Sequence, residues 1–120
     1  MDSSAWILNF LETNKKIEGL LSNEENDVLT SVLSFYEIAR FFGKKRADKE
    51  LPKALDIVRR RSAIVELTEK TCLEAAKEAA QHGLYAIDAI ILTSAKEHNA
   101  TLVTADKDFK GKNIRDVLFV

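Results

Sequence analysis

Short β-prone runs alternate with helical segments along this 120-residue chain, and this alternation limits the possible folds more than any other feature. The runs are rich in Val, Ile, Leu and Thr and occupy residues 28–30, 64–67, 101–104 and 117–120. Strands that are separated by helices favour parallel pairing, because a parallel crossover needs a long connection. The sequence therefore predicts an α/β protein, in which helices cover a short central parallel sheet.

Six helices are expected between and around these runs. Periodic apolar residues predict them at residues 5–11, 15–21, 32–42, 50–60, 69–82 and 86–98. Ser3 or Ser4 is the expected cap of the first helix. Ser34 and Glu37 match a capping box in the third helix, and Gly83 is the expected end of the fifth. No repeat, linker or low-complexity tract divides the chain, so residues 1–120 are expected to form a single domain.

Charge is segregated along the chain, although the net charge is only −1. Residues 40–61 contain nine basic and three acidic side chains, a net charge of +6, so the remainder carries −7. Basic side chains of this segment are candidates for contacting the phosphates of a nucleic acid: Arg40, Lys44, Lys45, Arg59, Arg60 and Arg61. A solvated helix face, or a surface for an acidic partner, explains the same pattern.

Cysteine content and hydropathy indicate the compartment. The single cysteine, Cys72, excludes an intramolecular disulfide, fits a reducing compartment and is expected to be a small core residue. The longest apolar run, residues 86–92, is interrupted by Asp88 and is too short to span a bilayer. The polar start of the chain lacks the features of a signal peptide. A cytoplasmic protein without a membrane segment is expected.

Two carboxylates stand in apolar helical surroundings. Asp88 lies inside the most apolar stretch of the chain, and Glu37 lies between Tyr36 and Ile38. Burial of a carboxylate costs several kcal/mol unless a partner compensates for it. Each position also has a local interpretation: Asp88 caps the last helix, and Glu37 closes its capping box or pairs with Arg40.

Further carboxylates follow predicted strands. Asp106 and Asp108 come directly after residues 101–104, and Asp2 lies at the corresponding end of what resembles the tail of a further strand. Asp residues at such positions often form turns or helix caps, which is the local interpretation here. In an open parallel sheet, however, ligands bind beyond the carboxyl ends of the strands.

Taken together, these acidic residues predict a metal site. Two like charges at about 4 Å repel by roughly 4 kcal/mol at an effective dielectric constant near 20. Several such pairs would threaten a domain whose stability is about 5–15 kcal/mol, and a divalent cation removes the conflict. A site of oxygen ligands without organised His or Cys favours Mg²⁺ or Mn²⁺ over Zn²⁺.

Other kinds of site have less support. His82 and His98 lie near predicted helix C-termini, where a cation complements the helix dipole. No arrangement of His with Ser or Cys suggests a covalent nucleophile, and no glycine-rich phosphate loop is present. A phosphoacceptor signalling domain would need an Asp at the end of a central strand, where this chain has Leu67, Thr68 and Glu69.

Four segments contain these acidic residues: Asp2-Ser3-Ser4-Ala5-Trp6-Ile7, residues 34–40, Tyr85-Ala86-Ile87-Asp88-Ala89-Ile90-Ile91 and residues 101–109. In this order they resemble the successive motifs of the PIN-domain family, with the greatest likeness to toxins of the VapBC type. The resemblance covers nearly the whole chain. It implies a three-layer α/β/α sandwich and a Mg²⁺- or Mn²⁺-dependent endoribonuclease that cleaves RNA. It also implies a homodimer and silencing by a cognate antitoxin.

The resemblance also implies roles for individual residues. The acidic quartet of the family falls on Asp2, Glu37, Asp88 and Asp106, and Asp108 matches a further acidic position near the metal. Ser4 and Thr104 match hydroxyl positions that support the site by hydrogen bonding. A non-catalytic PIN-like protein that acts by binding a partner is the alternative function.

The chain departs from the family pattern at its start. Members carry several apolar residues before the first Asp, and these form the first strand, whereas Asp2 directly follows Met1 here. Either the start has been trimmed or misassigned, or the first strand is vestigial. An Asp next to a free terminus is expected to be less rigidly held than its counterparts.

Overall fold

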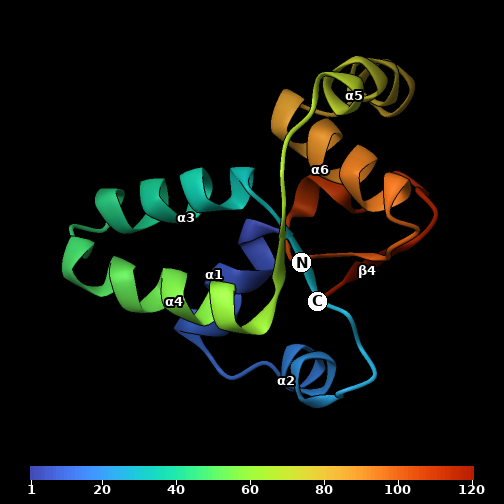
Figure 1. Cartoon of the computed structure of the whole chain (residues 1–120). Coiled ribbons are helices and arrows are strands. Elements are labelled where there is room, and N and C mark those ends of the chain that lie inside the picture. The colour runs from blue at the N-terminus through green and yellow to red at the C-terminus, as the bar shows by residue number, and fades with distance from the viewer.

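The computed structural model describes all 120 residues, in which helices alternate with strands of three residues each (Figure 1). The helices are α1 (Ser3–Leu11), α2 (Lys15–Ser22), α3 (Leu33–Lys44), α4 (Leu51–Arg61), α5 (Glu69–His82) and α6 (Ala86–Glu97), with the short 3-10 helices η1 (Asp48–Glu50) and η2 (Lys107–Phe109). The strands are β1 (Leu29–Ser31), β2 (Ala63–Val65), β3 (Leu102–Thr104) and β4 (Val117–Phe119). Each predicted helix is present, with its ends within two residues of the expected positions.

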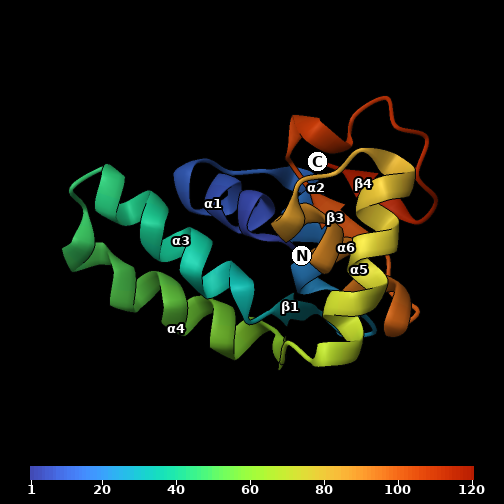
Figure 2. The ribbon, with the colours of Figure 1, turned by 90° about the horizontal axis from the view of Figure 1, so that it is seen from above.

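The strands form two separate parallel ladders. β1 pairs with β2, with Leu29 opposite Ala63, and β3 pairs with β4, with Leu102 opposite Val117. Figures 1 and 2 show α5 and α6 on one side of the molecule and the α3–α4 hairpin on the other. The predicted α/β class with flanking helices is therefore confirmed. The central sheet is divided in two rather than continuous.

Met1 and Asp2 lie between the two ladders. The Met1 ammonium donates a hydrogen bond to the carbonyl oxygen of Leu29 at 2.7 Å, and the Asp2 N–H donates to that of Val103 at 3.0 Å. Both views place the N-terminus near the middle of the molecule (Figures 1 and 2). Burial lowers the pKa of the Met1 ammonium below its usual value. These two residues thus occupy the position of a strand between β1 and β3.

The cap of α1 differs from the expectation. Asp2, and neither Ser3 nor Ser4, is the N-cap, because its Oδ1 accepts a hydrogen bond from the Ala5 N–H at 3.0 Å. An Asp at this position satisfies a backbone N–H that would otherwise have no partner in the helix. The start of α1 therefore holds the Asp2 side chain in place despite the nearby chain terminus.

The predicted capping box of α3 is wrong. The helix begins one residue later than expected, Val32 takes the N-cap position, and no side chain caps the helix. Ser34 consequently lies inside the first turn, where its hydroxyl is buried without a hydrogen-bond partner. Glu37 therefore makes no capping-box hydrogen bond within its own helix.

A core around Trp6 holds α1 against α3 and α4. The fully buried Trp6 side chain packs with Ile38, Phe42 and Val58, and its Nε1–H donates to Thr30 Oγ1 at 3.0 Å. Burial of aromatic and branched side chains contributes about 1.5–3 kcal/mol each. The first turn of α1, which carries Trp6, is thereby fixed against the second and third turns of α3, which carry Ile38 and Phe42.

A second core positions α6 against β3 and η2. Its buried members include Ala89 and Leu92 of α6, Leu102 of β3 and Phe109 of η2, and Leu84 closes it next to the end of α5. The end of α5 is formed by Gly83, which adopts a left-handed conformation with φ of 63°, as its position after His82 predicts. The chain after β3 is thus anchored beside the N-terminal half of α6.

Cys72 is exposed, contrary to the expectation of a core residue. Helix α5 buries Thr71 and Ala75, which lie four residues apart on one face, so that Cys72 faces solvent. No helix in this structure has both the length and the hydropathy that a membrane span requires.

Candidate metal centre

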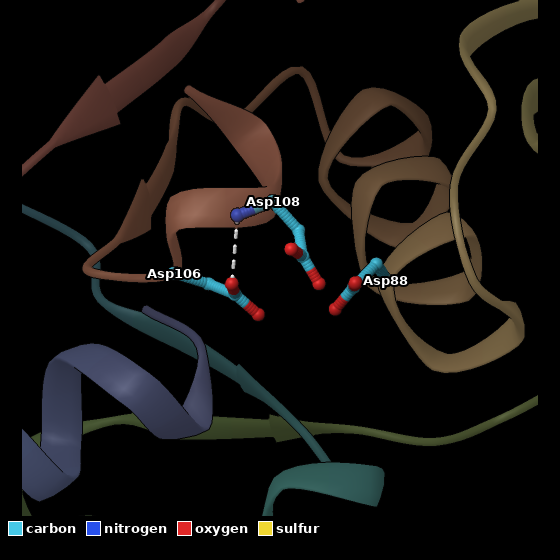
Figure 3. A group of neighbouring side chains, drawn as sticks. All are labelled: Asp88, Asp106 and Asp108. Carbon is cyan, nitrogen blue, oxygen red and sulfur yellow. Dashed lines mark hydrogen bonds between the residues drawn. The ribbon is translucent and has the colours of Figure 1, made fainter.

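Asp106 and Asp108 lie in the turn that follows β3. The Asp106 carboxylate accepts a hydrogen bond from the Asp108 N–H at 2.9 Å, so Asp106 does form the local turn that its position suggested (Figure 3). One oxygen of Asp106 remains available for another partner. The buried Phe109 holds the turn against the second core.

Asp88 projects from the first turn of α6 toward this turn (Figure 3). The N-cap of α6 is Tyr85, and no side chain caps the helix, so the interpretation of Asp88 as a helix cap is wrong. One oxygen from each of Asp88, Asp106 and Asp108 lies within 4.8 Å of the others. Three carboxylates from two elements therefore converge on one point.

Asp2 is buried next to these residues and is held by three hydrogen bonds. Its Oδ1 accepts from Ser4 Oγ at 2.7 Å and from the Ala5 N–H, and its Oδ2 accepts from Thr104 Oγ1 at 2.5 Å. The same Thr104 oxygen accepts from the Asp106 N–H at 3.0 Å. Desolvation raises the pKa of Asp2, while the bonds from Thr104, Ser4 and Ala5 oppose that rise.

Glu37 reaches the site from the second turn of α3. Its Oε1 accepts a hydrogen bond from Ser3 Oγ at 2.8 Å. Desolvation raises the pKa of Glu37, and the charges of Asp2 and Asp106 raise it further. The bond from Ser3 and the charge of Arg40 act in the opposite direction. Glu37 therefore faces the other carboxylates, and Arg40 does not neutralise it.

We call five residues the acidic cluster: Asp2, Glu37, Asp88, Asp106 and Asp108. Desolvation, followed by the charges of the other four members, raises the pKa of Asp88 to about 7. Like charges produce such a rise when several carboxylates share one site. The chain thus brings together side chains from its first residues, from α3, from α6 and from the turn after β3.

The acidic cluster fits a hard divalent cation. All of its donor atoms are carboxylate oxygens, and no His or Cys belongs to the converging group. One oxygen from each of the three Asp side chains lies within 4.8 Å of the others. Because Mg²⁺ binds oxygen at about 2.1 Å, these side chains would have to draw closer together to bind one ion.

The basic residues predicted to contact substrate are distributed over two places. Arg40 lies one turn after Glu37, and Lys44 and Lys45 follow at the end of α3. Arg60 and Arg61 instead line a groove beside residues that precede β1 and β3. This groove lies at the N-terminal ends of the strands, whereas the acidic cluster lies at their C-terminal ends.

The three arginines at the end of α4 make local contacts. Arg59 and Arg60 pair with Asp56 at 3.8 and 3.3 Å, and Arg61 donates to the carbonyl oxygen of Leu21 at 2.6 Å. Their side chains are exposed, and exposed pairs of this kind contribute little to stability.

Ser3 is the residue of this site that the sequence did not reveal. The sequence predicts only a possible helix cap at this position, whereas the Ser3 hydroxyl donates a hydrogen bond to Glu37. The two residues are 34 positions apart, so no local pattern connects them. The histidines lie outside the acidic cluster: His82 is 3.3 Å from Glu78, and His98 contacts the carbonyl oxygen of Ser94 at the end of α6.

Comparisons with known proteins agree on one family. Residues 1–114 match the family described as PIN domain. A search of curated protein sequences finds no match. Among solved structures, the chain resembles a toxin–antitoxin complex from Klebsiella pneumoniae with a TM-score of 0.74 and 21% identity, covering 98% of this chain and 92% of that chain. It resembles VapBC2 from Rickettsia felis, bound to a promoter DNA fragment, with the same TM-score and identity, covering 99% and 94%.

Proposed function

Since this chain belongs to the PIN-domain family, we propose that it is a Mg²⁺- or Mn²⁺-dependent endoribonuclease and the toxin of a toxin–antitoxin pair. The single observation that carries the proposal is the convergence of Asp88, Asp106 and Asp108. Nothing in the fold needs three carboxylates in one place, and their mutual repulsion costs stability unless a cation lies between them.

Asp88, Asp106 and Asp108 are the proposed ligands of the cation, because their oxygens lie nearest to one another. A divalent cation bound there would supply Lewis-acid activation of water and would neutralise charge on the scissile phosphate. Asp2 is proposed to contribute charge and position, because three hydrogen bonds already occupy its two oxygens.

Glu37 is proposed to act as the general base that accepts the proton of the attacking water. Its Oε1 is bound by Ser3, which leaves Oε2 free to accept that proton. The raised pKa of Glu37 makes it a better proton acceptor than an ordinary carboxylate. Ser3 would fix the direction in which Oε2 points.

Ser4 and Thr104 are proposed as supports of the site. Ser4 Oγ donates to Asp2 and accepts from the Ala105 N–H at 2.9 Å, so it ties α1 to the turn after β3. Thr104 Oγ1 connects the Asp2 carboxylate to the backbone of Asp106. Loss of either hydroxyl would loosen the position of Asp106.

RNA is proposed to enter along α3. Arg40 lies one turn after Glu37, and Lys44 and Lys45 extend the positive charge for a further distance of about 6–8 Å along the helix, given a rise of about 1.5 Å per residue. Arg59, Arg60 and Arg61 remain candidates for holding more distant parts of the RNA. Such contacts bind phosphates without reading the base sequence.

Partner and compartment follow from the same proposal. The two similar structures are toxin–antitoxin complexes, which supports a cognate antitoxin for this chain. We further propose a homodimer, and a cytoplasmic location in which the exposed Cys72 stays reduced.

The test is cleavage of a labelled single-stranded RNA by the purified chain with Mg²⁺, with Mn²⁺ and with excess chelator. Asp88→Asn and Asp106→Asn should each lower the rate by on the order of 100-fold or more. Asp116→Asn is the matched control, because Asp116 is exposed, lies outside the acidic cluster and has a φ of 57° that Asn tolerates. Its rate should be unchanged.

Two outcomes would contradict the proposal. Cleavage that continues in chelator would exclude a metal-dependent mechanism. A wild-type chain that binds Mn²⁺ but cleaves no RNA would be a non-catalytic PIN-like protein that acts through a partner.

A further inference from the structure

The exposed aromatic side chains of this protein lie at one place. Trp6 and the six phenylalanines are buried or half-buried. The two tyrosines are the exceptions, since Tyr36 is 60% exposed and Tyr85 is 75% exposed. Single exposed apolar side chains are common on protein surfaces and need no explanation. These two share a location, however, because each is close in sequence to a member of the acidic cluster.

Tyr36 directly precedes Glu37 on α3. The helix buries Ser34 and Ile38 against the first core and leaves Tyr36 in solvent. Arg40 follows four residues after Tyr36, so the two lie one turn apart on the same side of the helix, and Arg40 is also exposed. This face of α3 therefore offers an aromatic ring and a positive charge next to each other.

Tyr85 stands at the start of α6. It holds the N-cap position, where Ser, Thr, Asp or Asn would supply an acceptor, and its side chain makes no capping hydrogen bond. Asp88 follows three residues later, in the first turn. Side chains three positions apart on a helix are neighbours, about 5–6 Å between their Cβ atoms. The helix gives no structural reason for a tyrosine here, and the residue lies beside the acidic cluster.

The two tyrosines flank the acidic cluster from different helices. Figures 1 and 2 both show the first turns of α3 and α6 near each other. The charge of Glu37 acts on Asp88 across the cluster, which confirms that these two carboxylates face one another. A phosphodiester at the acidic cluster would thus have Tyr36 on the side of α3 and Tyr85 on the side of α6.

Stacking of bases is the interaction that such rings offer to a nucleic acid. Every base has a flat π face, and exposed aromatic side chains bind that face with little dependence on sequence. The faces are accessible in single strands, whereas neighbouring base pairs cover them in a duplex. The positive charge of Arg40 and Lys44 complements phosphates, which favours a nucleic acid over a protein as the occupant of this surface.

We propose that Tyr36 and Tyr85 bind single-stranded RNA, each by stacking on an unpaired base next to the phosphodiester that lies at the acidic cluster. The inference rests on the proposed function, because it takes RNA as the substrate. Arg40 holds a phosphate close to the base that stacks on Tyr36. Stacking of this kind selects for unpaired RNA and leaves the base sequence open.

Fluorescence anisotropy of a short labelled single-stranded RNA, in metal-free buffer, tests the proposal without any need for cleavage. Tyr36→Ala and Tyr85→Ala should each weaken binding about fivefold or more. Tyr36→Phe and Tyr85→Phe keep the ring and should bind within about twofold of the wild type. Leu73→Ala is the matched control, because Leu73 is 64% exposed on α5 and lies outside the acidic cluster, and its affinity should be unchanged.

Two further readouts separate stacking from charge and from folding. The tyrosine variants remove no charge, so the slope of log K against log salt should equal that of the wild type. Their affinity for a duplex of the same RNA should also be unchanged, because its base faces are covered. Circular dichroism should give wild-type melting temperatures, since both side chains are exposed.

Two results would overturn the proposal. Wild-type affinity for single-stranded RNA in either alanine variant would leave that ring for contact with a protein partner. An equal loss of affinity for the single strand and the duplex would show that the tyrosines do not act on bases. Cleavage of the same RNA with Mn²⁺ is measured separately. A wild-type chain that cleaves, with tyrosine variants that bind normally, would retain the proposed function and exclude this inference, whereas tyrosine-dependent binding without cleavage would do the reverse.

Discussion

At the scale of residues, hydroxyl groups decide how the carboxylates are held. Burial of Asp2 is costly, and hydrogen bonds to a charged group return about 1.5–3 kcal/mol each. Thr104 and Ser4 donate two such bonds, and the backbone of Ala5 donates a third. Ser3 does the same for Glu37. Four donors within the first turn of α1 and the end of β3 thus make an otherwise unfavourable group of charges possible.

Removal of the Ser3 hydroxyl should change the titration of Glu37. Ser3→Ala removes a hydrogen bond that lowers the pKa of Glu37, so that pKa should rise further. The acid limb of the pH profile of kcat/KM for RNA cleavage should move to higher pH. The maximum should fall about tenfold, which corresponds to ~1.5 kcal/mol for one such bond.

Ser3→Thr is the control for this prediction, since it keeps the hydroxyl. Its profile should match that of the wild type. An unchanged profile in Ser3→Ala would mean that Glu37 does not act on the proton of the attacking water.

At the scale of elements, α3 connects the acidic cluster to the basic residues. The helix carries Glu37 in its second turn and Arg40 one turn later, and it ends at Lys44. Helix α4 runs back beside it and ends with Arg59, Arg60 and Arg61 near the strand starts (Figure 2). The basic segment is continuous in the sequence, but its residues are divided between the C-terminal and the N-terminal ends of the strands.

The two parts of this segment should contribute differently to RNA binding. Changing Arg40, Lys44 and Lys45 to Gln should weaken binding and reduce the dependence of log K on log salt by up to about two units, at about 0.7 per phosphate contact with a single strand. Changing Arg59, Arg60 and Arg61 to Gln should have a smaller effect, because Arg60 and Arg61 lie at the N-terminal ends of the strands, away from the acidic cluster.

Fluorescence anisotropy with a labelled RNA, in metal-free buffer and at several salt concentrations, measures both quantities. Circular dichroism of each variant checks that the fold is retained. A larger loss of RNA binding in the α4 variant would place the RNA path across the N-terminal ends of the strands.

At the scale of the whole molecule, the acidic cluster opposes the stability that the two cores provide. Desolvation and mutual repulsion raise the pKa of Asp88 to about 7, and those of Asp2 and Glu37 rise as well. A carboxyl group whose pKa is higher in the folded state stabilises the fold at low pH. That contribution is complete below its unfolded pKa and is lost as the pH rises through the folded value.

The metal-free chain should therefore melt at a lower temperature at pH 8 than at pH 5.5. The Met1 ammonium, whose pKa is lowered, acts in the opposite direction below pH 8, so Asp88→Asn is needed to isolate the carboxylates. That variant should lose a large part of the difference between the two pH values. Mn²⁺ should raise the melting temperature of the wild type at pH 8 and raise that of Asp88→Asn much less.

Differential scanning fluorimetry at both pH values, with and without Mn²⁺, provides these melting temperatures. Asp116→Asn serves again as the control and should behave as the wild type. Equal melting temperatures for the wild type at pH 5.5 and pH 8, together with no response to Mn²⁺, would contradict the assignment of the acidic cluster as a metal centre.

The sequence by itself determined the helices, the positions of the strands and the residue types of the candidate site. Helix boundaries follow from apolar periodicity and from signals such as Gly83, which act within a few residues and survive in any tertiary context. Asp88 could be singled out for a similar reason, since the unusual placement of a carboxylate in an apolar stretch is visible in the local sequence.

Only the tertiary structure decided which side chains meet and how the sheet is divided. Thr104 binds Asp2 from 102 positions away, and Ser3 binds Glu37 from 34 positions away. The exposure of Cys72, the separation of the basic residues and the groove beside Met1 likewise depend on how elements pack. Sequence patterns encode the conformation of each segment, whereas the contacts between segments arise from burial and hydrogen bonding across distances that no local pattern records.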